Sequence, residues 1–252
     1  LLQLDKLDGD RKGVIRTIAE TGQIVTTLEE TFPASRLTNP QTFTSLLFYY
    51  GMLTIKGTFG DMMILGIPNN NVRKQYYGYL LEQYQEEKFV DLNQMKILFT
   101  YMALEGKWRE GLQFMADAYS KVSSVRDGIE SERNLQGFFM AYLNLNNYYY
   151  TAPELELNHG YCDFFLLPNL THYATKHSYI LELKVLSKKD YESKPEYGKL
   201  SKAETQWQEA EEQIKRYAAA PRVEALRQGT MLHKIIMQFV AGKLVRMEEV
   251  VC

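Results

Sequence analysis

The chain has 252 residues, of which 45% are hydrophobic and 24% are charged, and its formal net charge is -2. This length allows one large domain or two modest ones, and the composition is typical of a soluble globular protein, which excludes a disordered or fibrous chain. The small net charge also excludes a surface that is basic throughout, so any nucleic-acid contact must be local.

The ends and the cysteines give expectations about location. The opening stretch LLQLDKLDGD has neither a basic n-region nor a small-residue cleavage site, so we expect no signal peptide. It lacks an initiator Met, and we expect the chain to be part of a longer one. No apolar run reaches the roughly 18 residues of a membrane span. Only Cys162 and Cys252 are present, which predicts no disulfide framework and a cytoplasmic location.

The first half is predicted to be mainly helical around one small hairpin. Asn39-Pro40 is a typical helix start, and apolar residues at helical spacing follow it over 41–53. Two short alternating runs, 53–59 and 62–67, meet at Gly60-Asp61 and predict the hairpin. Further helices are expected at 71–87, 92–106 and 107–122. The order helix, hairpin, helix resembles a winged-helix module.

The second half has a different order of elements. We expect a helix at 131–145, strands at 148–158, 161–168 and 177–187, a helix from Ser201, and strands at 234–240 and 243–250. Ser201 and Glu204 form a capping box at the start of the later helix. The turn-rich SSVRDG at 123–128 places the domain boundary, giving domains 1–125 and 126–252. The predicted class is α/β, with an α-β-β-β-α-β core and a mixed sheet in the second domain.

One charged pair stands inside an apolar strand. Four Glu-x-Lys triplets occur in the chain, but only Glu182 and Lys184 lie within such a strand, YILELKV at 179–185. Because strand side chains alternate, both lie on one face. Burying these charges is costly unless they are paired or used. The pair is therefore either a structural ion pair at a sheet edge or part of a functional site.

A second carboxylate offers a partner for this pair. Asp163 lies at the head of the preceding strand, after a turn that contains Gly160. If the two strands are neighbours, Asp163 and Glu182 can reach one point, where a bound Mg²⁺ or Mn²⁺ would relieve their repulsion. The carbonyl of Leu183 and waters could complete the oxygen ligands. Lys184 could position a water or offset charge on a phosphate, as phosphodiester hydrolysis requires.

These motifs carry a family resemblance. The stretch ELELNHGYCDFFLLPN, followed by YILELK, resembles the PD-(D/E)XK nuclease superfamily, and more narrowly the nuclease domain at the C-terminus of prokaryotic AAA-ATPase-like proteins. The resemblance implies a restriction-endonuclease-like core over the second domain. It also implies roles for particular residues. Asp163, Glu182 and Lys184 correspond to the core triad, and Glu132 corresponds to the acidic residue on the first helix. Gln213 and Tyr217 correspond to the Gln and the Tyr on the later helix, and Glu156 to the Glu that opens the turn.

The resemblance extends upstream and also has departures. SLLFYYGMLTI and IPNNNVRKQYYGYL are similar to the segment after the ATPase core in these proteins, which implies that 1–125 follows an ATPase domain absent from this chain. The turn usually carries Gly-Arg, whereas Gly160 is followed here by Tyr161. Ordinary readings stay open for two residues: Glu132 as a first-turn helix residue, and Tyr217 as core packing.

A lysine-rich loop follows the charged strand. Lys188, Lys189, Lys194 and Lys202 stand close to Glu182 and Lys184 in sequence, and we predict that they contact the phosphates of nucleic acid. The alternative is a solvated loop without a ligand. Pro195 and Gly198 predict that this loop, 187–202, is mobile when nothing is bound.

The sequence therefore predicts a divalent-metal-dependent nuclease, with DNA as the expected substrate. One alternative is a nuclease fold without turnover that binds nucleic acid or assembles with proteins. Another is a protein-interaction domain that acts through the first half. No Gly-x-x-x-x-Gly-Lys-Ser/Thr motif occurs, so the chain is not expected to bind ATP through a P-loop. His159 and Cys162 have a zinc-like spacing but no second ligand pair, so we expect no zinc site.

Overall fold

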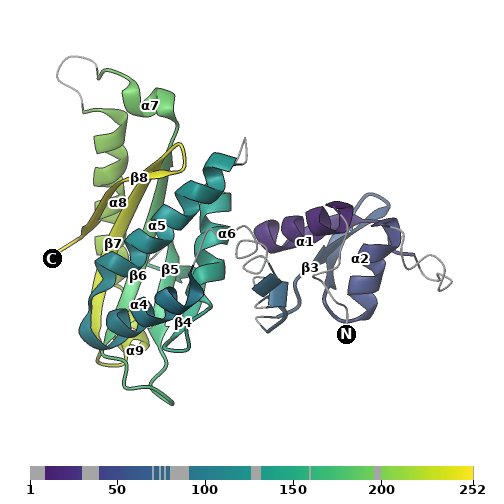
Figure 1. The fold of residues 1–252 in the computed structure, drawn as a ribbon, viewed down its shortest axis with the longest axis horizontal. Coiled ribbons are helices and arrows are strands. Elements are labelled where there is room, and N and C mark those ends of the chain that lie inside the picture. Colours follow the sequence, from purple (N-terminus) through teal and green to yellow (C-terminus); the bar gives the residue numbers. More distant parts are fainter. Residues whose placement is uncertain are drawn as a thin grey trace. The chain divides into compact units, whose positions relative to one another are not determined.

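The computed structural model describes residues 9–29, 40–69, 71–73, 75–76, 78–79, 91–125, 132–158, 160–195 and 200–251. The chain divides into two compact units, residues 1–86 and 87–252 (Figure 1). None of the helices in these described ranges combines the length and the apolar character that crossing a membrane requires.

The first unit is a small sheet with helices. Its elements are α1 (Gly9–Thr21), β1 (Gln23–Thr26), α2 (Pro40–Tyr49), β2 (Thr54–Phe59) and β3 (Met62–Gly66). The predicted hairpin is confirmed, because β2 pairs antiparallel with β3 and Gly60 takes a left-handed φ of 64° at the turn. The strand β1 was not predicted, and it pairs with β3 to give the order β1-β3-β2.

Apolar residues from both helices and from the sheet form the core of this unit. Ile15, Ile18, Phe43, Leu47 and Leu65 are all at most 1% exposed. They come from α1, α2 and β3, at the helical and strand spacings that place them inward. The expected helix over 71–87 is helical at the described residues 71–73, 75–76 and 78–79, and its remainder lies outside the described residues.

The second unit contains a five-stranded sheet. Its elements are α4 (Leu92–Glu105), α5 (Trp108–Val125), α6 (Glu132–Leu143), β4 (Tyr149–Leu157), β5 (Gly160–Pro168), β6 (His177–Leu186), α7 (Lys188–Glu192), α8 (Lys202–Ala218), α9 (Pro221–Arg227), β7 (Met231–Val240) and β8 (Lys243–Glu249). The strand order is β4-β5-β6-β7-β8, with β6 and β7 parallel and the other pairs antiparallel. The α-β-β-β-α-β order and the mixed sheet are confirmed.

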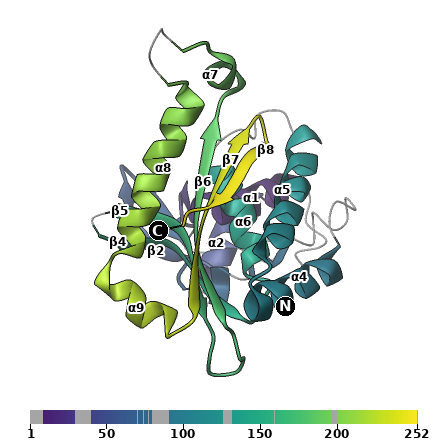
Figure 2. The ribbon, with the colours of Figure 1, turned by 90° about the vertical axis from the view of Figure 1, so that its left-hand side faces the viewer.

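Helices cover both faces of this sheet. In Figure 2, α8 lies on one side of the strands, and α4, α5 and α6 lie on the other. The stripe that the sequence predicts on α8 is buried: Trp207, Ala210, Ile214 and Tyr217. These residues pack with Cys162, Phe165, Ile180 and Ile236 of the central strands in one apolar cluster. Amphipathic spacing on α8 and apolar runs in β5, β6 and β7 therefore account for this layer.

The second unit begins earlier in the chain than the sequence analysis expects. We expected a boundary at 125/126, but α4 and α5 pack on the sheet within the unit 87–252. The Tyr179 hydroxyl on β6 donates to the Met102 carbonyl of α4 at 2.7 Å, and the Trp108 indole of α5 donates to Glu249 of β8 at 3.1 Å. The boundary expected from these turn-rich residues therefore falls inside one unit, because turn composition alone does not mark the edge of a core.

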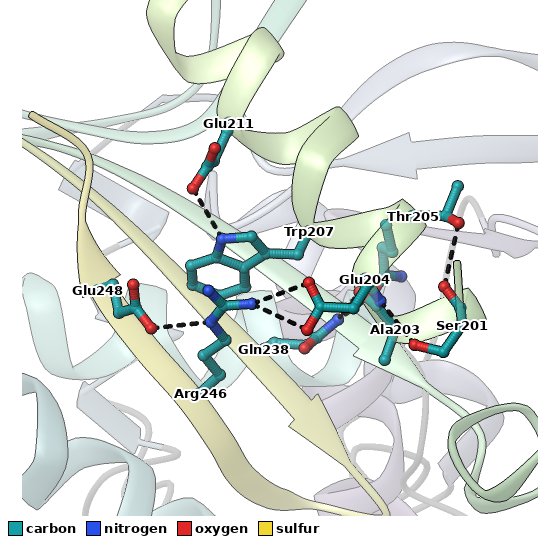
Figure 3. A network of polar contacts seen from close by, with 10 residues as sticks. Ser201, Ala203, Glu204, Thr205, Trp207, Glu211, Gln238, Arg246 and Glu248 are labelled. Atoms are coloured by element: carbon teal, nitrogen blue, oxygen red, sulfur yellow. Dashed lines mark hydrogen bonds and ion pairs between the residues drawn. The ribbon is translucent and has the colours of Figure 1, made fainter. Parts of the chain in front are cut away.

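A stacked cation fastens α8 to the edge strand β8. Figure 3 shows the Arg246 guanidinium lying over the Trp207 ring, 3.9 Å from the ring centroid. Glu248 accepts from Arg246 at 2.9 Å, and Glu204 accepts from it at 3.4 Å. Glu204 is the second member of the predicted capping box, and its backbone N–H donates to the Ser201 hydroxyl as expected. Its carboxylate reaches across to β8 instead of back to the cap.

Candidate active site

The candidate site lies where β5 and β6 stop pairing. Their ladder runs through Leu166–Tyr179, Phe165–Ile180 and Phe164–Leu181, and the next residues in that register are Asp163 and Glu182. Beyond the ladder, one carboxylate oxygen of Asp163 accepts the backbone N–H of Leu183 at 2.6 Å. A side chain therefore takes the place of a backbone carbonyl at this point. The two carboxylates that the sequence analysis paired do stand opposite one another.

The regular alternation of β5 also breaks at this position. Cys162 and Phe165 belong to the same core cluster, although they are three residues apart and a regular strand would direct them to opposite faces. A local irregularity between them includes Asp163. Such irregularities re-aim single side chains within a sheet. Asp163 thus lies between Cys162 and Phe165 in sequence without joining their apolar layer.

The helix α6 supplies a hydrogen-bond donor to Asp163 that the sequence analysis missed. The side-chain amide of Gln136 donates to the second carboxylate oxygen of Asp163 at 2.7 Å. Gln136 lies four residues after Glu132, so the two are neighbours on one side of the helix. That spacing was the available signal, but the sequence does not show which strand α6 crosses. Both oxygens of Asp163 are therefore held, one by the sheet and one by α6.

Glu182 and Lys184 form an ion pair inside the second unit. The Lys184 ammonium donates to one oxygen of Glu182 at 2.7 Å, and their side chains are 16% and 3% exposed. The other Glu182 oxygen, Oε2, is buried and has no hydrogen-bond partner among the described residues. Buried carboxylate oxygens are nearly always satisfied, so this oxygen is open to a cation or a proton.

Burial and mutual repulsion shift the pKa values of this cluster. Burial and the Glu182 carboxylate raise the pKa of Asp163 to about 7, against the lowering effect of the Leu183 N–H and of Lys184. Burial likewise raises the pKa of Glu182, while Lys184 lowers it. Burial lowers the pKa of Lys184, but the neighbouring Glu182 outweighs this, and the net change is upward. Lys184 is therefore an ammonium at neutral pH, and both carboxyl groups favour a bound cation or a proton.

Glu132, the acidic residue expected on the first helix, is the first residue of α6 and is exposed. Its charge contributes to the raised pKa of Asp163 and of Glu182, although burial is the main cause for both. A long-range charge contribution of this kind requires proximity within a poorly screened region. Glu132 is thus close enough for its charge to act on the carboxylate pair, and it is exposed to solvent.

Gln213 and Tyr217, expected on the later helix, lie one turn apart on α8. Tyr217 is 2% exposed and belongs to the core stripe, which supports the packing role that the sequence left open. Its ring also lies against Gly160, where an added Cβ would stand 2.7 Å from the ring. Glu182 contributes to the raised pKa of Tyr217, after burial. The Gln213 side-chain oxygen is buried without a described hydrogen-bond partner.

The predicted lysine loop contains a short helix that the sequence analysis did not predict. The residues of α7 are Lys188–Glu192, and the Ser187 hydroxyl caps it by accepting the N–H of Asp190 at 3.1 Å. The Lys202 ammonium pairs with Asp190, and Lys188 approaches Glu192 at 3.8 Å. Residues 196–199 of the predicted mobile loop lie outside the described residues. The pattern Ser-x-x-Asp was a readable cap signal.

A pocket of about 290 Å³ opens beside Asp163. Gln136, Glu154, Tyr161 and Cys162 line it together with Asp163. Glu154 lies between Pro153 and Leu155, which pair with Phe164 and Cys162 on β5, and it takes a left-handed φ of 47°. Residues other than Gly rarely adopt this backbone conformation within a strand, and the residue type alone did not reveal it.

Other chemistries fit these residues less well. The described part of the chain holds no group of three His, Cys, Asp or Glu side chains that could bind a metal ion together. A cation at Asp163 and Glu182 would therefore need backbone and water ligands. Burial raises the pKa of Cys162 to about 12, so it stays a thiol and is a poor nucleophile. His159, its partner in the rejected zinc spacing, lies outside the described residues.

Comparison with known proteins gives one match. Residues 130–249 match the family model described as the PD-(D/E)XK nuclease superfamily. The match takes in all elements from α6 to β8, and so it includes Asp163, Glu182 and Lys184. Neither curated proteins nor solved structures gave a match. The match and the order of elements agree, so residues 130–249 are similar to the PD-(D/E)XK nuclease superfamily.

Proposed function

We propose that this domain hydrolyses phosphodiester bonds of nucleic acid, with DNA as its substrate, and that it requires a divalent cation. The observation that carries the proposal is the pair Asp163 and Glu182, two carboxylates on adjacent strands at a break in the ladder. One Glu182 oxygen is buried there without a partner. Such an oxygen is costly unless a cation or a proton meets it.

The donor set fits Mg²⁺ or Mn²⁺. Asp163 and Glu182 supply carboxylate oxygens, and the Leu183 carbonyl is a third candidate. The N–H of Leu183 points toward β5, and the N–H and C=O of one strand residue point to the same neighbour, so its carbonyl faces the break as well. Mg²⁺ commonly binds through one or two carboxylates and keeps several waters. The small number of protein ligands is therefore compatible with this ion.

When bound, the cation would act as a Lewis acid on a phosphoryl oxygen. Lys184 is charged at neutral pH, so in this proposal it donates to a phosphate oxygen and does not act as a general base. Gln136 holds the Asp163 carboxylate in place. The exposed Glu132 and the side-chain oxygen of Gln213 are candidates to orient the attacking water, and Tyr217 packs against Gly160.

The function is tested by metal binding and cleavage together. Mn²⁺ titration by calorimetry is expected to give one site per chain, and the full chain is expected to cleave plasmid DNA in Mg²⁺ or Mn²⁺ but not in EDTA. Labelled RNA of matched length serves as the competing substrate. Nucleic-acid binding without cleavage in either metal would instead identify a fold that binds without turnover, and absence of both Mn²⁺ binding and cleavage would refute the proposal.

The lysines after β6 give a separate prediction. Replacing Lys188, Lys189 and Lys194 together with Ala is expected to weaken DNA binding and to lower the slope of affinity against salt by up to about three phosphate contacts. Their exposed side chains follow directly on the strand of Glu182 and Lys184. Lys202 is omitted because Asp190 already pairs with it. Affinity measured from about 50 to 200 mM salt checks the slope.

A matched triple variant controls for net charge. Lys96, Arg222 and Lys243 are exposed on other elements of the same unit, and replacing them with Ala removes the same charge. The control is expected to keep most of the salt slope of the wild type, and Mn²⁺ affinity should stay unchanged in both variants. Equal slopes in the two triple variants would show that the lysines after β6 make no specific phosphate contacts.

For the first unit we propose a winged-helix-like module that follows an ATPase domain in a longer protein. The support is the β1-β3-β2 sheet with α1 before it and α2 between β1 and β2, together with the sequence resemblance described above. Phe59 at the hairpin is 65% exposed and Ile55 is 47% exposed. Exposed apolar residues on a hairpin favour a contact role for it. Deleting the hairpin tip is expected to leave Mn²⁺ binding by the second unit unchanged.

A further inference from the structure

The pocket beside Asp163 has a composition that does not suit a phosphate. Of the described residues that line it, none is Lys or Arg, and Glu154 adds a negative charge next to Asp163. A phosphate group needs cationic or N–H donors, which this lining does not concentrate. The lining instead combines an aromatic ring, a carboxylate and an amide, from Tyr161, Glu154 and Gln136. These groups recognise planar ligands that carry amino groups.

Tyr161 and Glu154 are both available to a ligand. Tyr161 is 61% exposed, although it lies on β5 between Gly160, which pairs with β4, and the buried Cys162. Exposed aromatic side chains of this kind serve as stacking surfaces for nucleobases. Glu154 is also exposed. Its backbone is left-handed, which is unusual within a strand. Strain at a residue that lines a pocket favours a functional reason for its conformation.

The size and position of the pocket limit the ligand further. Its volume of about 290 Å³ is just below the roughly 300–1,000 Å³ of typical ligand sites, which suits a single planar group better than a larger ligand. Asp163 belongs both to this pocket and to the carboxylate pair. A group in the pocket is thus adjacent to a phosphate held at Asp163 and Glu182. In a nucleic acid, that neighbouring group is the base of the same or the next nucleotide.

We propose that the pocket receives one unstacked nucleobase beside the scissile phosphate, with Tyr161 as the stacking surface and Glu154 as the acceptor of a hydrogen bond from an amino group of the base. This inference rests on the proposed nuclease function and specifies its substrate as single-stranded or locally unpaired nucleic acid. A base inside a duplex cannot enter such a pocket without leaving the stack. Among pyrimidines, cytosine offers an amino donor to Glu154, whereas thymine does not.

The proposal is tested by binding of short labelled oligonucleotides to the full chain, with Ca²⁺ in place of Mg²⁺. Tyr161→Ala is expected to weaken binding of a single-stranded dodecamer by roughly 5- to 150-fold. Tyr161→Phe should stay close to the wild type, and the duplex should be nearly indifferent to both changes. Tyr150→Ala is the matched control, because Tyr150 is 55% exposed on β4 and is not among the residues that line the pocket. It should bind like the wild type.

Glu154 is tested by base preference and by stability. The wild type should bind oligo-dC more tightly than oligo-dT by about threefold to tenfold, in line with one net hydrogen bond. Glu154→Gln, whose amide can also donate to thymine, should level this difference. Glu154→Gly should abolish it while raising the melting temperature by a few degrees, because Gly adopts a φ of 47° without strain.

Two results would overturn the subsite. The first is equal binding of single strands by Tyr161→Ala and Tyr150→Ala, and the second is duplex binding as tight as single-strand binding with no base preference. Either result leaves metal-dependent cleavage intact, so the nuclease function would stand without the base pocket. Wild-type protein that neither binds Mn²⁺ nor cleaves any nucleic acid overturns both proposals at once.

Discussion

Asp163→Asn is expected to lower metal-dependent cleavage by about a thousandfold or more, because a bound cation supplies several kcal/mol of transition-state stabilisation and Asp163 is one of its two carboxylate ligands. Mn²⁺ binding measured by calorimetry should be lost or much weakened. The fold should remain, because Asn keeps the size of the side chain and can still accept one hydrogen bond where Leu183 and Gln136 now donate. The measurement is initial cleavage rate at saturating Mg²⁺.

The same variant should change how stability depends on pH. The pKa of Asp163 in the folded chain is raised to about 7, well above its usual value, so the metal-free wild type gains stability below pH 4 and loses it as pH rises through 7. Asp163→Asn lacks this titration. Its free energy of unfolding relative to the wild type should therefore improve by up to about 4 kcal/mol between pH 4 and pH 8. Urea unfolding at both pH values gives this difference.

Two controls separate the role of Asp163 from general effects of charge and of stability. Glu209→Gln removes one negative charge from an exposed position on α8, and it should change neither cleavage nor the pH dependence. Saturating Mn²⁺ should stabilise the wild type at pH 8, because it binds only the folded state, and should leave Asp163→Asn unchanged. A variant that still cleaves at the wild-type rate, or that unfolds at pH 4 and pH 8 alike, would falsify the assigned role.

Much of this site could be predicted from the sequence, because its main residues lie on strands. Alternation placed Glu182 and Lys184 on one face, and the order of strands brought Asp163 opposite Glu182. The mixed sheet followed from the same elements, since a helix separates β6 from its parallel neighbour β7. These inferences needed only periodicity and the short connection between β5 and β6.

The residues that the sequence analysis missed depend on three-dimensional placement. Gln136 reaches Asp163 because α6 crosses β5 at one particular height, and no periodicity in α6 encodes that height. Glu154 lines the pocket because its backbone is left-handed, a conformation that residue type predicts for Gly and Asn but not for Glu. The packing of α4 and α5 on the sheet also depends on tertiary contacts. Local patterns reveal faces and ends of elements, and packing decides which of them meet.

The element α7 shows a signal that was present but outweighed. Ser187 and Asp190 have the spacing of a helix cap, and the Ser187 hydroxyl does accept the Asp190 N–H. The lysines and the nearby Pro195 favoured a loop instead. The cap orders the first five residues after Ser187 into a helix, so Lys188 and Lys189 lie on a defined element. Their proposed phosphate contacts would then need less ordering on binding.

Lys184→Met is expected to reduce cleavage by about a hundredfold to a thousandfold while Mn²⁺ binding is retained. The ammonium is charged at neutral pH and lies 2.7 Å from a Glu182 oxygen, so it can offset negative charge on a phosphate but contributes no electron pair to a cation. Removing it frees that Glu182 oxygen for a cation, so Mn²⁺ binding measured at pH 8 should be retained. Single-turnover cleavage and calorimetry separate the two effects. A loss of Mn²⁺ affinity equal to the loss of rate would contradict the assignment.

The stability of Lys184→Met should itself depend on pH and on metal. Without Lys184, the Glu182 carboxylate is buried and unpaired, which costs on the order of 3–5 kcal/mol when one partner of a buried pair is removed. Burial already raises the pKa of Glu182, and loss of Lys184 raises it further, so the group stays protonated in the folded variant up to a higher pH than in the unfolded chain. A folded-state pKa above the unfolded value gives stability that is present at low pH and lost as pH rises.

The deficit of the variant should therefore be large at pH 8 and small at pH 4, and saturating Mn²⁺ at pH 8 should reduce it, because the cation then takes the place of the missing ammonium. Lys184→Arg, which keeps the charge, should show no such pH-dependent deficit. A deficit of equal size at both pH values would mean that Lys184 contributes packing and not charge compensation.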